Sequence, residues 1–215
     1  MRLAVFDLDG TITRRDTLGQ YVCGYLARHP WRYPGLPRVL PALLRFGLGL
    51  ADHGELKAAF IRSTLRGCSR SQIDAWNATF VPALLARGVF ANAIERVTAH
   101  AQAGDRLVLM SASPDLYVPA IARALGFAES VCTGVRWNGD RLDGALTTPN
   151  RRGEAKLHCL QALRLAHPGL KTVAYGNAGS DLPHLRVADQ GVLVNGDAAA
   201  RRAASEAGVA TVEWN

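Results

Sequence analysis

The sequence predicts an α/β fold in which helices cover both faces of a parallel sheet and a helical insertion follows the first strand. A short apolar run at the N-terminus, RLAVFDL, ends at an Asp-Gly pair, as a buried strand does when it opens into a loop. Helical patterns fill about residues 16 to 86, and strand and helix patterns alternate after Gly88. We therefore expect an α/β core formed by residues 1–15 and 89–215, and a small helical cap formed by residues 16–88.

The predicted cap contains helix candidates and no convincing strand. The segment ADHGELKAAFIRSTLRG has apolar residues at helical spacing and ends at Gly67. The segment SRSQIDAWNATFVPALLARG is a second candidate, in which we expect Pro82 to kink or break the helix. The cap should therefore be helical throughout.

The rest of the chain alternates between the two kinds of element. We expect helices in FANAIERVTAHAQAG, PDLYVPAIARALG, GEAKLHCLQALRLAH, DLPHLRVA and DAAARRAASEAG, and strands in RLVLM, KTVAY and GVLV. The segments SVCTGVRW and RLDGALT flank Asn138-Gly139-Asp140, a sequence that favours a β-hairpin. The segment VATVEW ends the chain.

The composition indicates a globular protein with a substantial core. Of the 215 residues, 48% are hydrophobic and 20% are charged, which argues against a disordered chain. The net charge of +7 favours an anionic partner such as a phosphorylated metabolite, an acidic membrane surface or nucleic acid, although an arginine-rich proteome would explain it equally well. Because the basic residues are scattered and no recognition motif is present, we expect no nucleic-acid partner.

The cysteines and the hydropathy bear on location. Cys23, Cys68, Cys132 and Cys159 form no CxxC pair, so we expect reduced thiols rather than a zinc site or a disulfide framework. The N-terminal segment does not resemble a signal peptide, and no run of about 18 uncharged apolar residues is present. We expect a cytoplasmic protein, with peripheral contact at the inner face of the membrane as an open alternative.

Two carboxylates follow the first predicted strand. Asp7 and Asp9 are two residues apart, and alternate residues of an extended chain point to the same side. Such a pair can supply one nucleophile and one acid/base if a cation offsets the mutual repulsion. Gly10 lets the backbone turn sharply, which would leave main-chain N–H groups free to face an anion. The alternative is a plain Asp-Gly turn that closes the strand.

Hydroxyl groups follow the strand predicted in RLVLM. Ser111 and the following N–H groups, beginning at Ala112, lie at a strand end and before a helix that we place near Pro114. This position predicts phosphate binding by Ser111 and Ala112. For Ser113 we favour the role of an ordinary helix N-cap.

The remaining candidates lie near the C-terminal strands. Lys156 is early in a predicted helix, where an isolated lysine is usually solvated. The loop GNAGSD follows the strand predicted in KTVAY, and its Asn177 and Asp181 offer the oxygen ligands that suit Mg²⁺. The alternative is a turn in which Asp181 caps the next helix. Because chemistry in open α/β sheets gathers at the carboxyl ends of strands, we expect these residues to lie together.

The order of DLDGT, SAS, the lysine and GNAGSD resembles that of the haloacid dehalogenase superfamily of phosphatases, in the branch that includes phosphoserine phosphatase. The resemblance covers nearly the whole chain, and the helical insertion lies where that branch has its cap. It implies a three-layer Rossmann-like core with a small cap of the C1 type. It also implies magnesium-dependent hydrolysis of phosphomonoesters, in which Asp7 attacks phosphorus. Asp9 would protonate the leaving alcohol and then activate water.

The same resemblance assigns the binding roles. Ser111 and Lys156 would hold the phosphoryl oxygens. Asp7, the carbonyl oxygen of Asp9 and the GNAGSD loop would bind Mg²⁺.

One position departs from the family pattern, which usually has Asp where this chain has Asn177. An amide coordinates through its oxygen but brings no charge, so we expect weaker Mg²⁺ binding in which Asp181 carries more of the load. Asn177 is also the one feature that favours a catalytically weak phosphate-binding or regulatory protein.

The residues after the first strand bear on substrate choice. Asp16 lies where phosphoserine phosphatases have a carboxylate that meets the substrate amine, and we assign Asp16 and Arg15 to substrate specificity. A structural aspartate near Arg14 and Arg15 is an equally good interpretation. A substrate carboxylate would need a cation on the cap, for which Arg62 and Arg66 are candidates.

The segment from Trp31 to Leu50 mixes aromatic and aliphatic residues with arginines. Such a segment suits a helix at an anionic membrane surface, although we slightly favour packing of its apolar face inside the cap. This cap and the tail VLVNGDAAARRAASEAG resemble phosphatidylglycerophosphatase C-like members of the branch. We therefore expect a lipid phosphate or a related glycerol-type phosphate as substrate, with a small soluble metabolite such as phosphoserine as the alternative.

The histidines lie outside these motifs. His184 follows the GNAGSD loop, where we favour a place on the helix surface over a supporting role in the site. The other histidines are expected on the surface or in packing: His29, His53, His100, His158 and His167.

Overall fold

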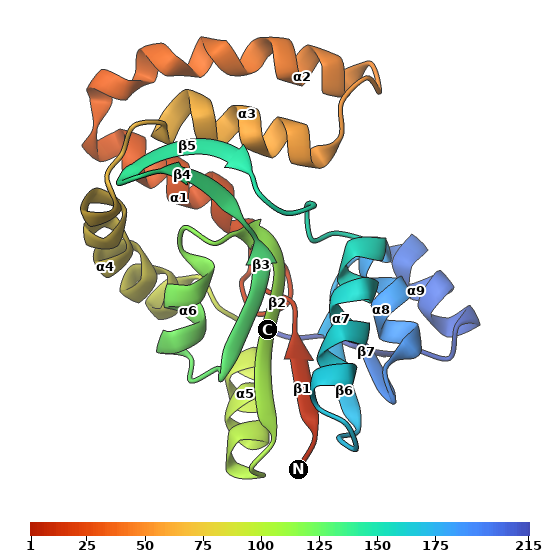
Figure 1. Ribbon diagram of the computed structural model, residues 1–215. Coiled ribbons are helices and arrows are strands. Elements are labelled where there is room, and N and C mark those ends of the chain that lie inside the picture. Colours follow the sequence, from red (N-terminus) through yellow and green to blue (C-terminus); the bar gives the residue numbers. More distant parts are fainter.

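The structure, a computed structural model of residues 1–215, is built on a six-stranded sheet in the order β3-β2-β1-β6-β7-β8 (Figure 1). All neighbouring strands of this sheet pair in parallel, with β1 between β2 and β6. The predicted α/β class is therefore confirmed. The strands are β1 (Leu3–Phe6), β2 (Arg106–Pro114), β3 (Glu129–Thr133), β6 (Thr172–Gly176), β7 (Gln190–Val194) and β8 (Ala210–Val212).

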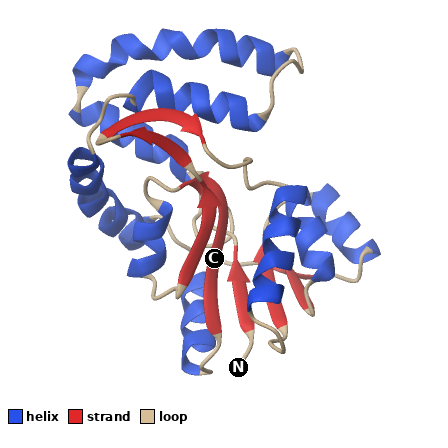
Figure 2. Ribbon diagram, in the orientation of Figure 1, coloured by secondary structure: helices blue, strands red, loops and turns tan.

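Helices cover both faces of the sheet, as the alternating sequence pattern predicts (Figures 1 and 2). Successive residues of β1 point to opposite faces, so Leu3 and Val5 pack in one apolar cluster while Ala4 and Phe6 pack in the other. Both clusters consist of buried hydrophobic residues, which explains why the sequences of the central strands are continuous apolar runs. One face carries α5 (Ala91–Gln102) and α6 (Val118–Ala124), and the other carries α7 (Glu154–Ala166), α8 (Leu182–Val187) and α9 (Ala198–Glu206).

The predicted helical insertion lies over the carboxyl ends of the strands, at the top and left of Figure 1. Capping boxes of Asp52 with Glu55 and of Ser69 with Gln72 start its two longest helices. Its elements are α1 (Thr17–Arg28), the 3₁₀ segment η1 (Pro30–Val39), α2 (Leu40–Gly47), α3 (His53–Leu65) and α4 (Arg70–Arg87).

Two details of the predicted elements need correction. Pro82 does not break α4, which continues to Arg87, because buried neighbours such as Phe80, Val81 and Leu84 anchor the helix on both sides of it; a kink at Pro82 remains a prediction. The segment SVCTGVRW is not one arm of a hairpin. Its first part is β3 at the edge of the main sheet, and only the second part enters the hairpin of β4 (Val135–Asn138) and β5 (Arg141–Leu146).

The hairpin packs under α3 and extends the cap (Figure 1). The N–H of Gly67 donates to the carbonyl of Leu142, and the N–H of Leu142 donates to the carbonyl of Cys68. A division into a core of residues 1–15 and 89–215 and a cap of residues 16–88 remains our proposal, with the hairpin as a part of the core that lies against the cap.

The apolar face of α2 does not pack inside the cap, contrary to the interpretation that the sequence slightly favoured. No residue of α2 is buried, and Leu44 and the following Leu48 are 67% and 72% exposed. Trp31, in the preceding segment, is 70% exposed. No helix of the structure has both the length and the apolar character needed to cross a membrane. All four cysteines are free thiols, as expected.

Candidate active site

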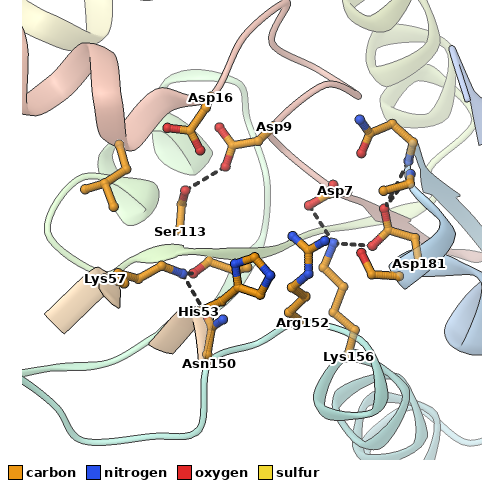
Figure 3. Close-up of a pocket in the computed structure, with 15 residues that line it drawn as sticks. Asp7, Asp9, Asp16, His53, Lys57, Ser113, Asn150, Arg152, Lys156 and Asp181 are labelled. Atoms are coloured by element: carbon orange, nitrogen blue, oxygen red, sulfur yellow. Dashed lines mark hydrogen bonds and ion pairs between the residues drawn. The ribbon is translucent and has the colours of Figure 1, made fainter. Parts of the chain in front are cut away.

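A cleft of about 270 Å³ lies where β1, β2 and β6 end, and His53 and Lys57 of the cap helix α3 form part of its wall (Figure 3). It collects carboxylates from two segments that are far apart in the sequence, residues 7–16 and Asp181, together with cations from both the core and the cap. Its walls are formed by Asp7, Asp9, Asp16, Leu18, His53, Lys57, Ala112, Ser113, Asn150, Arg152, Lys156, Asn177, Ala178, Ser180 and Asp181.

Lys156 is buried between two carboxylates rather than solvated. Its Nζ lies 2.7 Å from Oδ1 of Asp7 and 2.7 Å from Oδ1 of Asp181 (Figure 3). Asp7 comes directly after β1 and Asp181 directly after the loop that follows β6, while Lys156 lies in the first turn of α7. The parallel topology thus brings together three residues that the sequence assigned separately.

The pKa values of the two carboxylates that share Lys156 are displaced in opposite directions. Burial raises the pKa of Asp7 above its ordinary value, against the opposing effect of the Lys156 ammonium. Burial acts in the same way on Asp181, but Lys156 and a backbone N–H bond from Ala178 outweigh it and lower its pKa. Burial alone would lower the pKa of Lys156, and the two carboxylates raise it above the ordinary value. Lys156 is therefore a fixed positive charge. Of the two carboxylates that share it, Asp7 is the one whose pKa lies above the ordinary value.

Asp9 is held by hydrogen bonds to both oxygens. The hydroxyl of Ser113 donates to Oδ2 at 2.6 Å, and the N–H of Thr17 donates to Oδ1 at 2.7 Å. The Thr17 hydroxyl in turn lies 3.0 Å from the hydroxyl of Tyr117. Burial raises the pKa of Asp9, while the bonds from Ser113 and Thr17 oppose the rise. The sequence interpretation of Ser113 as an N-cap is wrong, because β2 continues to Pro114.

Ser111 and Ala112, the predicted phosphate ligands, take different positions. Ala112 lines the cleft. Ser111 is fully buried behind it, and its Oγ accepts a hydrogen bond from the N–H of Ser113 at 3.0 Å. A phosphate contact by Ser111 remains a prediction.

Gly10 serves the site by leaving space rather than by donating a free N–H. Its N–H donates to the carbonyl of Thr13, so the predicted role of that N–H in anion binding is not supported. Gly10 has φ of +78°, and a Cβ added there would lie 2.0 Å from Nδ2 of Asn177. The amide of Asn177 therefore takes this position beside the loop that follows β1 because residue 10 is glycine.

The loop that contains Asn177 is tied to Asp181. The N–H groups of Asn177 and Ala178 both donate to Oδ2 of Asp181 at 3.1 Å. The Asp181 side chain makes no capping hydrogen bond to α8, so the alternative of a capping aspartate is wrong. The carboxylate is instead directed toward Lys156 (Figure 3).

The cap contributes cations that the sequence did not single out. Lys57 donates from α3 to the carbonyl of Ala112 and to Oδ1 of Asn150, which ties the cap to the core (Figure 3). Burial lowers the pKa of Lys57 to about 8. His53 is exposed and packs against Phe46, as expected of a surface or packing residue, and it also lines the cleft one helical turn earlier on the same face of α3. That i, i+4 spacing is the signal that could have found the pair.

Of the two predicted specificity residues, only Asp16 lines the cleft. Asp16 lines the cleft, and its Oδ1 caps α1 by accepting from the N–H of Gly19 at 2.8 Å. Arg15 is exposed and does not line the cleft, nor do the proposed cap cations Arg62 and Arg66. On the core side, the arginine that does line it is Arg152, just before α7.

Comparison with known proteins agrees with this geometry. The sequence matches the family described as haloacid dehalogenase-like hydrolase over residues 4–186, which is most of the chain. The chain belongs to this hydrolase family.

Several relatives are similar over most of the chain. It is 31% identical to the protein CicA of Caulobacter vibrioides over 194 residues, which cover 87% of this chain and 83% of CicA. It is 26% identical to phosphoserine phosphatase SerB1 of Mycobacterium tuberculosis, covering 95% of this chain and 68% of SerB1. A crystal structure of a protein of unknown function from Bordetella pertussis Tohama I shares the fold, with a TM-score of 0.82 at 23% identity and coverage of 98% and 97%. These relatives place the chain among the phosphatases of the family, in the phosphoserine-phosphatase-like branch.

The cleft of this haloacid dehalogenase-like hydrolase fits a hard divalent cation. Four carboxylates line it against three cationic side chains, so its negative charge is not fully compensated. No cluster of three His, Cys, Asp or Glu residues has metal-site geometry, which leaves two carboxylates supplemented by amide and carbonyl oxygens as the donor set. Oxygen ligands of this kind suit Mg²⁺, whereas Zn²⁺ usually takes Cys and His ligands.

His184 is buried, not on the helix surface as expected. Neither ring nitrogen has a hydrogen-bond partner, and burial together with the Lys156 charge lowers the pKa of His184 to about 4. The folded state therefore holds the ring neutral, while the unfolded chain takes up a proton near pH 6.5. The free energy of unfolding should therefore fall by up to about 3 kcal/mol, because of this group, as pH falls from 6.5 to 4.

The variant His184→Leu should remove this acid-dependent loss. We expect the difference in unfolding free energy between His184→Leu and the wild type, measured by urea denaturation, to shift in favour of the variant as pH falls through this window. The exposed His158→Leu is the matched control and should show no such shift. A difference that does not change with pH for His184→Leu would contradict the assignment of a neutral buried ring.

Proposed function

We propose that the chain is a magnesium-dependent phosphomonoesterase in which Asp7 forms an aspartyl-phosphate. The observation that carries this proposal is the placement of Asp7, at the end of the central strand and paired with Lys156, beside an Asp9 held by Ser113. A nucleophile and an acid/base separated by one residue, next to a buried cation, match the needs of phosphoryl transfer, which depends on positioning and charge neutralisation.

The proposed reaction has two steps. A carboxylate oxygen of Asp7 attacks phosphorus, the bond from phosphorus to the alcohol oxygen breaks, and Asp9 gives that oxygen a proton. Water then attacks the phosphorus of the aspartyl-phosphate while Asp9 takes its proton, the bond to Asp7 breaks, and inorganic phosphate leaves. Lys156 and Arg152 neutralise charge on the phosphoryl oxygens, and Ser111 and Ala112 are proposed to bind them from β2.

Mg²⁺ would be held by Asp7, the carbonyl oxygen of Asp9, Asn177 and Asp181. When bound, it supplies positive charge that allows an anionic nucleophile to approach an anionic phosphoryl group. This proposal is supported by the excess of carboxylates in the cleft and by the space that Gly10 leaves for Asn177.

For the substrate we propose a lipid phosphate or a related glycerol-type phosphate. The exposed apolar residues of α2, with Arg38 and Arg45 beside them, support contact with an anionic membrane that carries such a substrate. The second candidate is phosphoserine, because SerB1 is named a phosphoserine phosphatase and Asp16 lines the cleft.

Phosphate release from a panel of substrates tests the function. The panel contains detergent-dispersed phosphatidylglycerophosphate, glycerol phosphate and phosphoserine, each with Mg²⁺ and with a chelator. We expect Mg²⁺-dependent release that is fastest for the lipid. Preference for phosphoserine would favour the second candidate, and no release from any substrate at high Mg²⁺ would favour a phosphate-binding protein without turnover.

Asn177 provides a test of the metal site. We expect Asn177→Asp to tighten Mg²⁺ binding by roughly tenfold, because a carboxylate adds a charge that an amide lacks. The matched variant Asn177→Ala should weaken binding. Both are measured by calorimetric titration with MgCl₂, a readout that does not depend on turnover, and an unchanged affinity in Asn177→Asp would place Asn177 outside the coordination shell.

A further inference from the structure

A second cleft, of about 360 Å³, adjoins the active site and lies among the cap elements α1, η1, α2 and α3. Four residues line both clefts, so the two are continuous: Asp16, Leu18, His53 and Lys57. The other residues that line the second cleft are Gly19, Val39, Leu43, Leu56 and Phe60.

The chemistry changes from one cleft to the next. The active-site cleft is lined mainly by charged and polar side chains, and the second cleft has polar groups only where it joins the first. Its far walls are Val39, Leu43, Leu56 and Phe60, contributed by η1, α2 and α3. Water finds few hydrogen-bond partners in such a cleft. Transfer of a hydrocarbon group from water into the cleft has a favourable free energy.

The second cleft opens on the side where the leaving alcohol departs. Figure 3 shows Asp16 beside Asp9, the proposed acid for the alcohol oxygen, with Asp7 between this pair and Asp181. Asp16 and Asp9 both line the active-site cleft, and Asp16 is one of the residues that this cleft shares with the second one. A phosphomonoester whose phosphorus lies at Asp7 would therefore direct its alcohol part toward the residues shared by the two clefts.

The outer end of the second cleft reaches the exposed face of the cap. Leu18 and Val39 are 8% and 6% exposed at its floor, while Leu43 at its rim is 46% exposed. Leu43 lies on α2, next to Leu44 and in the same exposed apolar row as Leu40. A chain that fills the cleft could continue onto this surface without meeting a charged wall.

We infer that the second cleft binds the hydrocarbon part of the substrate, so that the enzyme acts on amphiphilic phosphomonoesters with an apolar chain close to the phosphate. This inference rests on the proposed function for the reaction itself, but the cleft and its apolar walls do not depend on turnover. A small polar alcohol such as serine has no group that would use these walls. The polar groups at the junction, Lys57 and Asp16, would face the linkage between phosphate and chain.

Binding of n-alkylphosphonates tests the inference independently of catalysis. Methyl-, butyl- and octylphosphonate are titrated calorimetrically in the presence of Mg²⁺, each below its micelle concentration. We expect the affinity to rise with chain length, by up to about fourfold for each methylene that becomes buried. Leu56→Ser and Leu43→Ser should flatten this dependence while leaving methylphosphonate affinity unchanged. The control Leu48→Ser changes a leucine of the same cap surface that does not line the cleft, and it should keep the wild-type dependence.

Each result decides between the two claims. An affinity that does not rise with chain length in the wild-type protein, or a rise that both cleft variants retain, would overturn the hydrocarbon site. Hydrolysis of the matching alkyl phosphates is measured in parallel. Absence of Asp7-dependent phosphate release, together with a chain-length dependence that the cleft variants lose, would overturn the phosphatase reaction and leave the hydrocarbon site standing.

Discussion

Asp7→Asn is expected to abolish phosphomonoester hydrolysis, with a loss of kcat on the order of 10⁴-fold or more. The amide is nearly isosteric with the carboxylate but cannot attack phosphorus to form an acyl phosphate. Burial disfavours the ionised form of Asp7, so removing its charge should leave the unfolding temperature unchanged or raise it. The measurements are phosphate release with the best substrate of the panel and thermal unfolding followed by circular dichroism.

Asp9→Asn is the matched comparison for this variant. Asp9 lies two residues after Asp7. The substitution would remove the acid/base but keep the nucleophile. With an activated ester such as p-nitrophenyl phosphate, whose leaving group needs no proton, Asp9→Asn should still form the phosphorylated protein in a rapid-quench experiment, and Asp7→Asn should not. Phosphorylated protein in Asp7→Asn would show that another residue is the nucleophile.

The sequence predicts the part of the site that depends on topology. Asp7 and Asp181 follow from locating strand ends, because a parallel sheet gathers these positions at one edge, whereas the role of Lys156 followed from the family resemblance. The GNAGSD loop is predictable for the same reason. The sheet class could be predicted because its central strands are buried on both faces and therefore read as unbroken apolar runs.

What the sequence could not supply depends on contacts between the cap and the core. Lys57 looks like one charge on a solvated helix until α3 is placed over β2 and the lysine meets the carbonyl of Ala112. Ser113 was misassigned because local pattern placed a helix start at Pro114, whereas pairing with β3 extends β2 to that residue. The solvent exposure of α2 could not be predicted either, because an apolar helical face has the same sequence pattern whether or not a neighbouring element covers it.

Removal of the central cation has the largest expected effect on stability. Lys156→Met leaves the buried carboxylates of Asp7 and Asp181 without their shared partner, and breaking a buried ion pair in this way costs about 3–5 kcal/mol. We expect a loss of that size in the free energy of unfolding, measured by urea denaturation without divalent cations, and loss of phosphatase activity. The exposed lysine of Lys171→Met is the control and should change the free energy by less than about 0.5 kcal/mol.

The cause of this loss can be separated from simple damage to packing. If unpaired charge is responsible, the loss should shrink as pH falls, because Asp7, whose pKa burial already raises, takes up a proton and becomes neutral. The double variant Lys156→Met with Asp7→Asn should likewise recover part of the stability, since one buried charge is removed along with the cation. A loss that is independent of pH and is not relieved by Asp7→Asn would mean that the methylene chain of Lys156, not its charge, supports the fold. In that case the buried ammonium would serve the bound phosphate rather than the stability of the empty site.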